Sequence, residues 1–306
     1  MSETAVLLMA YGTPSTPDEI EPYLADIRRG RTPSPEAVQE LKSRYAKIGG
    51  RSPLLEITKA QASALERQLW SNGLDVNVYF GMKHWHPYIR EVIPQIIDSG
   101  SSRVICVALA PHFSEISIGG YRKAFDEANE GRLKADFVES WYNNPLFHVA
   151  VAEKVKEAFK KFANPDTVEL VFTAHSLPER ILEQNDPYPT QLQSSCKSVA
   201  ELLKRDRWSF AYQSAGMTQE KWLGPDLLEF LDKLSKCNDL EGVLVVPIGF
   251  VADHLEILYD IDVEAQEYAR KHSLHLERTD SLNATPAFIS ALDDIVQKQM
   301  KQNALS

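Results

Sequence analysis

The sequence contains little cysteine. Only three of its 306 residues are cysteines, and Cys106, Cys196 and Cys237 stand far apart. An odd number of widely spaced cysteines argues against a disulfide framework and against a zinc knuckle. It argues equally against an iron–sulfur cluster held by thiolates. We therefore expect reduced thiols and no iron–sulfur cluster.

Long apolar runs are also absent. None approaches the roughly 18–20 apolar residues that a helix needs to span a bilayer. The N-terminal stretch MSETAVLLMAYG has no basic region and no small-residue cleavage site of the kind that marks a secretory signal. We expect a cytoplasmic protein that does not insert into membranes.

The chain has too little positive charge to bind nucleic acid in general, because its net charge is −10 and such binding needs a basic surface. One stretch, residues 28–51, runs against this balance with seven basic and two acidic residues. It is either an ordinary charged helical surface or a patch for an anionic small molecule carrying carboxylates or phosphates. The basic residues are Arg28, Arg29, Arg31, Lys42, Arg44, Lys47 and Arg51.

Glycine-rich phosphate motifs are missing as well. No GxGxxG follows the first apolar strand, and no GxxxxGK[ST] occurs, so dinucleotide and P-loop functions lose their main support. What is present is the composition of a soluble globular protein, 43% hydrophobic and 25% charged. The length suffices for one large α/β domain or two of ordinary size.

Apolar strands alternate with amphipathic helices along the whole chain. Strands are predicted at 5–10, 76–80, 103–110, 135–140, 168–173, 208–212, 243–248 and 274–276. Helices are predicted between them, the last over about 286–300. This alternation predicts an α/β fold of two doubly wound, Rossmann-like domains with parallel sheets and a cleft between them. We expect the domains to span residues 1–143 and 144–283, with a C-terminal helix in 284–306 packing back on the first.

Polar side chains follow many of the predicted strands. Ligands of doubly wound sheets bind beyond the carboxyl ends of the strands, so these side chains should line one site. They are Tyr11, Lys83, His84, His112, Ser114, His175, Ser176, Gln213, Ser214, Asp253, His254 and Glu256.

An acidic segment follows the most apolar strand, residues 243–248. Glu256, Asp260 and Glu264 fall four residues apart, which places them on one side of a helix. No Lys or Arg between Asp253 and Glu264 offsets them. Like charges at this spacing cost about 0.2–0.5 kcal/mol per pair. The segment is either a solvated helix face or a cation path whose innermost carboxylate, Glu256, faces the cleft.

Nine motifs in the same order along the chain resemble those of the ferrochelatases, which insert ferrous iron into a porphyrin. They are AYGTP (10–14), IGGRSPL (48–54), APHFS (110–114), SWY (140–142), AHSLPE (174–179), DPYP (186–189), QS-G (213–216), WLGPD (222–226) and PIGFVADHLEILYD (247–260). The chain is most similar to the soluble, monomeric type of Gram-positive bacteria that acts on coproporphyrin III. That type carries Tyr in AYGTP, where the protoporphyrin type usually has NLGTP.

The resemblance implies a chelatase-type fold and a role for each matching residue. His175 and Glu256 would bind the metal and accept protons, a task suited to an imidazole beside a carboxylate. Asp260 and Glu264 would relay cations or protons, and Tyr11 would be an axial ligand to iron in the product. The residues expected around the propionates are Arg28, Arg44, Tyr45, Ser52 and Tyr121, with Arg29 and Arg31 in support.

Iron is then a substrate, and no tightly bound cofactor is expected. The other partners would be the porphyrin and, transiently, an enzyme that processes the coprohaem product. The sequence departs from close relatives at Ala215, where Glu or Arg often stands, and at Tyr212, where Trp is common. It also lacks the cysteine-bearing extension of some relatives and their apolar membrane lip.

Other functions stay open. Protoporphyrin IX could be the substrate, and a cobalt or nickel chelatase of related fold would use similar ligands. Ser176 beside His175 suggests a hydrolase, but no GxSxG elbow is present and adjacent residues rarely give the required geometry. A non-catalytic haem-binding or haem-delivery protein would need the cleft but not the Glu256 carboxylate.

Overall fold

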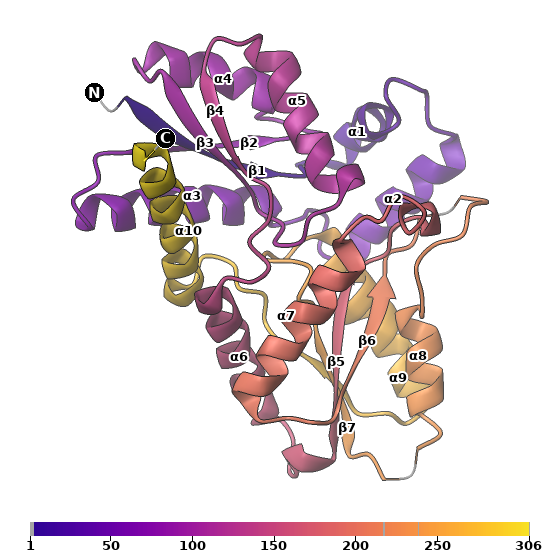
Figure 1. Cartoon of the computed structure of the whole chain (residues 1–306). Coiled ribbons are helices and arrows are strands. Elements are labelled where there is room, and N and C mark those ends of the chain that lie inside the picture. Colours follow the sequence, from indigo (N-terminus) through magenta and orange to yellow (C-terminus); the bar gives the residue numbers. More distant parts are fainter. Residues whose placement is uncertain (1–2, 217, 238, 306) are drawn as a thin grey trace.

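Two parallel sheets of four strands each form the framework (Figure 1). The computed structural model describes residues 3–216, 218–237 and 239–305. The first residue of the predicted N-terminal domain and the last residue of the predicted C-terminal helix segment, residues 1 and 306, lie outside the described residues. The predicted fold class is confirmed: the chain is an α/β protein with two parallel sheets and helices around them.

The N-terminal sheet has the strand order β2-β1-β3-β4. Its strands are β1 (Thr4–Ala10), β2 (Asn77–Met82), β3 (Arg103–Ala108) and β4 (Lys134–Val138), all paired in parallel. Alternate residues of β1 enter different cores, because successive side chains point to opposite faces. Val6 and Leu8 pack with α3 (Leu54–Ser71), whereas Leu7 and Met9 pack with α4 (Ile89–Asp98) and α5 (Gly120–Asn129).

The C-terminal sheet repeats this plan with the order β6-β5-β7-β8. Its strands are β5 (Val168–His175), β6 (Trp208–Gln213), β7 (Gly242–Val246) and β8 (Leu276–Arg278). One face packs on α6 (Pro145–Phe159) and α7 (Tyr188–Leu203). The other packs on α8 (Leu227–Leu234), α9 (Gln266–Lys271) and the π-helix that precedes α9.

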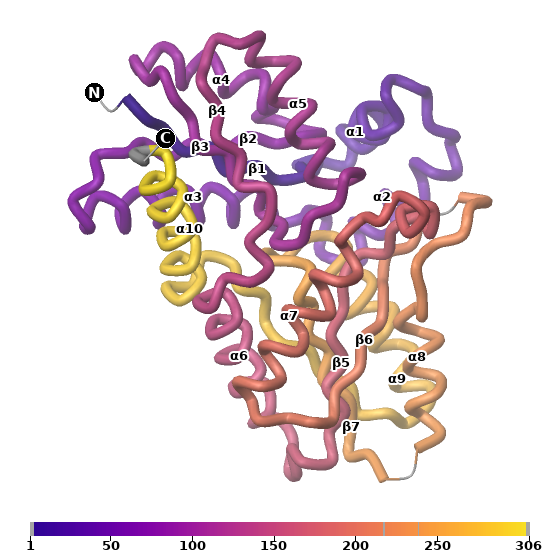
Figure 2. Tube along the Cα trace, viewed as in Figure 1, coloured from indigo at the N-terminus to yellow at the C-terminus, as the bar shows by residue number. Residues whose placement is uncertain are grey.

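A single apolar core extends from one sheet to the other. It contains Val6 and Leu8 of β1 together with Phe172 of β5 and Val246 of β7. The last helix, α10 (Pro286–Leu305), belongs to it through Phe288. Figure 2 shows α10 running beside both α3 and α6. Because α10 contacts helices of both halves, it ties them together.

The remaining helices lie in the segments that connect the strands. A 3₁₀ turn at Pro17–Glu19 leads into α1 (Ile20–Ile27), and α2 (Pro35–Lys47) follows. The Ser34 hydroxyl accepts a hydrogen bond from the Ala37 amide at 3.3 Å, so Ser34 caps the N-terminus of α2. Short 3₁₀ turns also occur at Pro165–Thr167 and Glu179–Ile181, and a π-helix at Glu115–Gly119. Among the described residues, no helix combines the length and the apolar character needed to cross a membrane.

The acidic segment departs from the prediction. The sequence predicts an α-helix from Asp253, but the chain forms a π-helix over Ile257–Ala265. A π-helix has i→i+5 hydrogen bonds and therefore a wider turn, and such helices often occur at functional sites. The preceding strand is also shorter than predicted, since β7 ends at Val246 and the chain turns at Pro247. This early end leaves residues 247–254 as a connecting segment, and Leu255 and Glu256 are the first helical residues before the π-helix.

Truncating Phe288 should test the contribution of α10 to the shared core. Its ring is fully buried, and the centroid of this ring lies 6.1 Å from the centroid of the Trp141 ring. We expect Phe288→Ala to lower the free energy of unfolding by about 3–5 kcal/mol, measured by urea denaturation. Lys298→Ala, at an exposed position on the same helix, should change it by less than about 0.5 kcal/mol. Equal effects of the two substitutions would contradict this account.

Candidate active site

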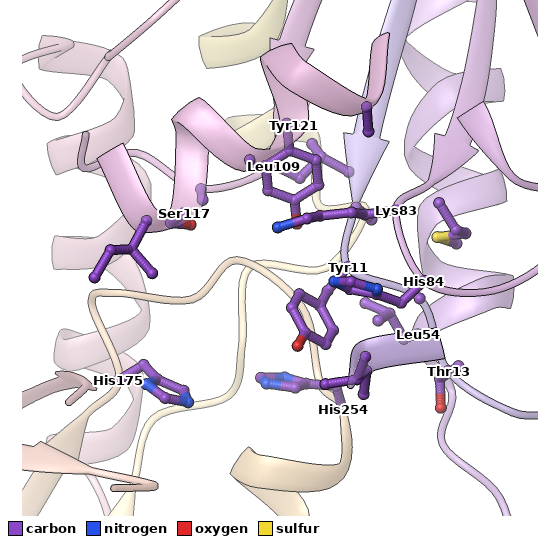
Figure 3. A pocket seen from close by; sticks show the side chains of 18 of the residues that line it. Tyr11, Thr13, Leu54, Lys83, His84, Leu109, Ser117, Tyr121, His175 and His254 are labelled. Carbon is purple, nitrogen blue, oxygen red and sulfur yellow. The ribbon is translucent and has the colours of Figure 1, made fainter. Parts of the chain in front are cut away.

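A deep cleft of about 1290 Å³ lies where the carboxyl ends of the two sheets face each other. Both halves of the chain line it (Figure 3). Of the polar side chains that follow the predicted strands, seven are in its lining: Tyr11, Lys83, His84, His112, His175, His254 and Glu256. The prediction of a shared strand-end layer therefore leads to one cavity.

His175 and Glu256 meet on the C-terminal side of this cleft. His175 is the last residue of β5, and its Nε2 lies 3.4 Å from Glu256 Oε1. Its Nδ1 donates to the Ser176 carbonyl, which leaves Nε2 toward the carboxylate. The segment carrying Glu256 can pass this close to β5 because residue 249 is glycine. A Cβ there would lie 2.5 Å from Ala174 Cβ.

Glu256 has a second histidine neighbour that the sequence interpretation missed. His254 Nε2 lies 3.4 Å from Glu256 Oε2, and His254 Nδ1 donates to the Ala252 carbonyl at 2.9 Å. The sequence placed His254 in the strand-end layer but assigned it no role. The signal was present in DHLE, where a histidine and a glutamate stand two residues apart at the start of a helix.

Burial and charge act against each other at this pair. Burial lowers the pKa of His175, but the Glu256 carboxylate outweighs it and raises that pKa to about 9. Burial likewise opposes ionisation of Glu256, yet His175 and His254 hold its pKa well below the usual range. The resting pair is thus an imidazolium beside a carboxylate. Binding a metal at His175 Nε2 would require that proton to leave.

The acidic stripe formed by Glu256, Asp260 and Glu264 leads from the cleft to the surface. Glu256 lines the cleft, Asp260 is buried behind it, and Glu264 is exposed. Burial and the Glu256 charge raise the pKa of Asp260 to about 6. The Ser214 hydroxyl donates to Asp260, and Arg44 lies 3.8 Å away. Asp260 can therefore exchange a proton near neutral pH.

Tyr11 stands on the opposite side of the cleft. Figure 3 shows its ring between Lys83 and His84 above and the two histidines, His175 and His254, below. Its ring centroid is 4.6 Å from that of His84. Although 43% of Tyr11 is accessible, it lies inside the cleft, where burial and the charge of Glu256 raise its pKa well above 10. Tyr11 is therefore a neutral phenol at neutral pH.

The residues predicted around the propionates fall into two groups. Tyr45, Ser52 and Tyr121 line the cleft, whereas Arg28 and Arg44 are outside its lining. The Tyr45 hydroxyl shares a 2.7 Å hydrogen bond with Thr13, and the Ser52 hydroxyl accepts from the Leu54 amide. Arg44 forms an ion pair with Glu40 at 2.8 Å.

Five other cations line the cleft instead: Arg29, Lys83, Arg90, Lys123 and Arg180. Arg180 and Lys123 form ion pairs with neighbouring glutamates, and Arg90 lies over the Tyr88 ring. Within the part of the chain that the structure describes, Arg29 and Lys83 have no ion-pair partner. Lys83 Nζ lies 5.4 Å from the centre of the Tyr121 ring, and burial together with Arg29 lowers its pKa. The resemblance described above predicts Arg29 as a supporting charge around the propionates. Lys83 was predicted only to be one of the polar side chains that follow the strands.

His84 and His112 are held by the protein. His84 Nδ1 lies 2.8 Å from Asp26, and His112 Nε2 lies 2.9 Å from Ser195 Oγ. Burial, with a smaller effect of His148, lowers the pKa of His112 to about 3. His112 is therefore neutral and joins β3's loop to α7, in addition to lining the cleft.

The geometry does not support a hydrolase. The buried Ser176 hydroxyl donates to the Leu223 carbonyl at 2.8 Å, so it is engaged with the backbone.

The part of the chain that the structure describes contains no group of three or more His, Cys, Asp or Glu side chains that could hold a metal ion.

The sequence model of the ferrochelatase family matches residues 3–300. The chain belongs to the ferrochelatase family. It is 47% identical over 304 residues to the ferrochelatase of Herpetosiphon aurantiacus, an alignment that covers 97% of this chain and 99% of that protein. It is 40% identical over 301 residues to the coproporphyrin III ferrochelatase of Bacillus subtilis, covering 96% and 97% of the two chains. The ferrochelatases are metal-inserting enzymes, and so is this protein.

Solved structures support the fold. SirB from Bacillus subtilis with Fe³⁺ has a TM-score of 0.58 at 11% identity, with 97% of this chain and 96% of that chain covered. At this identity the likeness concerns the fold alone. The arrangement of two facing parallel sheets is thus shared with a chelatase whose sequence is very different.

The His175 pKa can be tested on the protein without substrate. By histidine NMR, with His175→Ala for assignment, we expect His175 to titrate at about 9, because Glu256 stabilises its charged form. In Glu256→Gln that stabilisation is gone while burial remains. The pKa of His175 should then fall below its ordinary value of about 6.5. Titration near 6.5 in both proteins would contradict the ion pair.

Proposed function

We propose that this protein inserts Fe²⁺ into coproporphyrin III to give coprohaem, the iron complex, as a step of haem biosynthesis. The observation that carries the proposal is a pair of cations without ion-pair partners, Arg29 and Lys83, in the described cleft of an acidic protein. An anionic ligand would supply the missing partner. The hydroxyls of Tyr45, Ser52 and Tyr121 along the same cleft could bind further carboxylate oxygens.

The number of carboxylates favours coproporphyrin III over protoporphyrin IX. Coproporphyrin III has four propionates and protoporphyrin IX has two. The basic segment 28–51 would place Arg28 and Arg44 near the mouth as additional charges for the more anionic substrate. The similarity to proteins named coproporphyrin III ferrochelatase, at about 40% identity, supports this choice. Protoporphyrin IX is the alternative that the same cleft could hold.

The porphyrin would lie between Tyr11 and the His175–Glu256 pair. Insertion forms four iron–nitrogen bonds and releases two pyrrole protons. His175, once it has lost its proton, would bind Fe²⁺ through Nε2 while Glu256 accepts a proton or shares the metal. Gripping a bent macrocycle from both sides would bring a pyrrole lone pair toward the metal.

The acidic stripe gives the released protons a way out. Asp260, whose pKa of about 6 lies near neutral pH, can accept a proton from the Glu256 side and release it again. Glu264 at the surface would pass it to solvent. The same carboxylates could guide an incoming cation, so the proposal assigns Asp260 and Glu264 a relay in either direction.

Tyr11 would act on the product. Its high pKa would keep it a phenol before iron is inserted, so that it would not compete for Fe²⁺. Once iron is in the macrocycle, its charge would favour the phenolate and make Tyr11 an axial ligand. We further propose that the protein is a cytoplasmic monomer that passes coprohaem to the next enzyme by transient contact.

Substrate preference is tested by anaerobic Fe²⁺ insertion, followed by the loss of free-porphyrin fluorescence. We expect a higher kcat/KM for coproporphyrin III than for protoporphyrin IX, because Arg29 and Lys83 meet more carboxylates in the first. Lys83→Met should reduce this preference by raising the KM for coproporphyrin III. Equal or better turnover of protoporphyrin IX by the unmodified protein would overturn the substrate assignment.

Glu256→Gln tests whether the Glu256 carboxylate takes part in iron insertion or only in porphyrin binding. The substitution removes the proton acceptor but keeps the shape, so iron insertion should fall about 10²- to 10⁴-fold. Porphyrin binding, measured by fluorescence quenching, should stay within a few-fold of the original. Glu267→Gln, at an exposed position beyond the stripe, is the matched control and should leave both unchanged. Insertion that survives Glu256→Gln would remove Glu256 from the mechanism.

A further inference from the structure

Asn283 connects three parts of the chain beside the active site. Its backbone amide donates to the Val251 carbonyl at 2.9 Å, and its side chain makes two bonds with Asp253. The Asp253 amide donates to Asn283 Oδ1 at 2.9 Å, and Asn283 Nδ2 donates to Asp253 Oδ2 at 2.9 Å. The side-chain amide of Asn283 thus binds the segment that carries His254 and Glu256 through both its oxygen and its nitrogen.

The backbone of Asn283 explains why few residues could replace it. Its φ is +45°, in the left-handed region that asparagine and glycine adopt more readily than other residues. This conformation lets the amide and the side chain face residues 251–253 at once. An asparagine satisfies the conformation and both hydrogen bonds, whereas glycine would satisfy only the conformation.

Asp253 is fixed from other directions as well. Its carboxylate accepts a hydrogen bond from the Ser281 hydroxyl at 2.8 Å and lies 3.2 Å from Arg278. Arg278 also forms two bonds with Asp262 of the π-helix, at 2.6 and 2.8 Å. Asp253 therefore belongs to a polar network that holds the segment directly before His254 and Glu256.

The fourth polar group of Asn283 reaches the other half of the protein. Its carbonyl accepts a 2.9 Å hydrogen bond from Gln61 Nε2 on α3. Gln61 is fully buried and lines the N-terminal side of the cleft. A residue of the substrate-binding side and the segment carrying Glu256 are thus joined through Asn283.

We infer that Asn283 is a positioning residue that holds His254 and Glu256 in place against the opposite side of the cleft. The inference rests on the proposed function for its catalytic consequence, because it concerns the placement of the proposed proton acceptor. Glu256 must lie 3.4 Å from two histidines at once. Misplacement of a reacting group by about 1 Å can cost on the order of 10²-fold in rate.

The test uses Asn283→Asp and Asn283→Gly, both of which tolerate the left-handed backbone. The aspartate places a carboxylate against that of Asp253, and the glycine removes both side-chain bonds. We expect kcat for iron insertion to fall about 10- to 100-fold in each. The KM for porphyrin should change less than threefold, since Asn283 itself is not part of the cleft lining and its backbone bonds to Val251 and Gln61 remain.

Asn72→Asp and Asn72→Gly are the matched controls. Asn72 Nδ2 donates to Asp293 at 2.9 Å, and this bond links the end of α3 to α10. Like Asn283, Asn72 thus connects two distant segments through its side chain. Neither Asn72 nor Asp293 lines the cleft. These substitutions should lower the thermal midpoint without changing kcat. If they reduce kcat as much as the Asn283 variants do, general loosening of the fold explains both, and the inference is wrong.

Amide hydrogen exchange gives a second measurement that needs no activity. The Asp253 amide is bonded to Asn283 Oδ1, so peptides covering residues 250–256 should exchange faster in Asn283→Gly than in Asn72→Gly. Unchanged exchange there, or an active Asn283→Asp enzyme with its original kcat, would overturn the inference. If the unmodified protein inserts no iron at all, the proposed function fails while the exchange result still decides the structural link.

Discussion

The site depends on one negative charge inside the cleft. Glu256 lies between His175 and His254, and burial alone would raise the pKa of its carboxyl. The two imidazoles reverse that effect, because a nearby positive charge stabilises the ionised form more strongly where water is scarce. In return the carboxylate keeps His175 protonated. The early end of β7, the glycine at 249 and the network around Asp253 all serve to bring this carboxylate to the end of β5.

The alternation of apolar strands and helices was sufficient to predict the two parallel sheets and their order along the chain. Strands such as β1 and β7 are almost wholly buried, and their sequences are correspondingly apolar. The π-helix at Ile257–Ala265 could not be predicted in this way, because its hydrophobic spacing differs little from that of an α-helix. Its residues Ile257, Ile261 and Ala265 pack in one core with residues of α8 and β7, and these contacts cannot be read from the spacing within the segment.

The site was predictable where chemistry and sequence are local. The motifs AHSLPE and DHLE identify His175 and Glu256 as neighbours of strand ends. What they could not give is which arginine faces the cleft, since Arg28 and Arg29 are adjacent and the turn at Arg29, with φ of +56°, decides between them. The linking role of Asn283 could not be predicted for another reason, because its partner Gln61 lies 222 residues away in the sequence.

The apolar core shared by the two sheets has a mechanical consequence. Both sheets and α10 contribute to one core, so a change in the width of the cleft would have to disturb close packing there. Under the proposed function, a bound porphyrin would adapt its shape to the walls of the cleft, and the macrocycle would take up the energy of distortion.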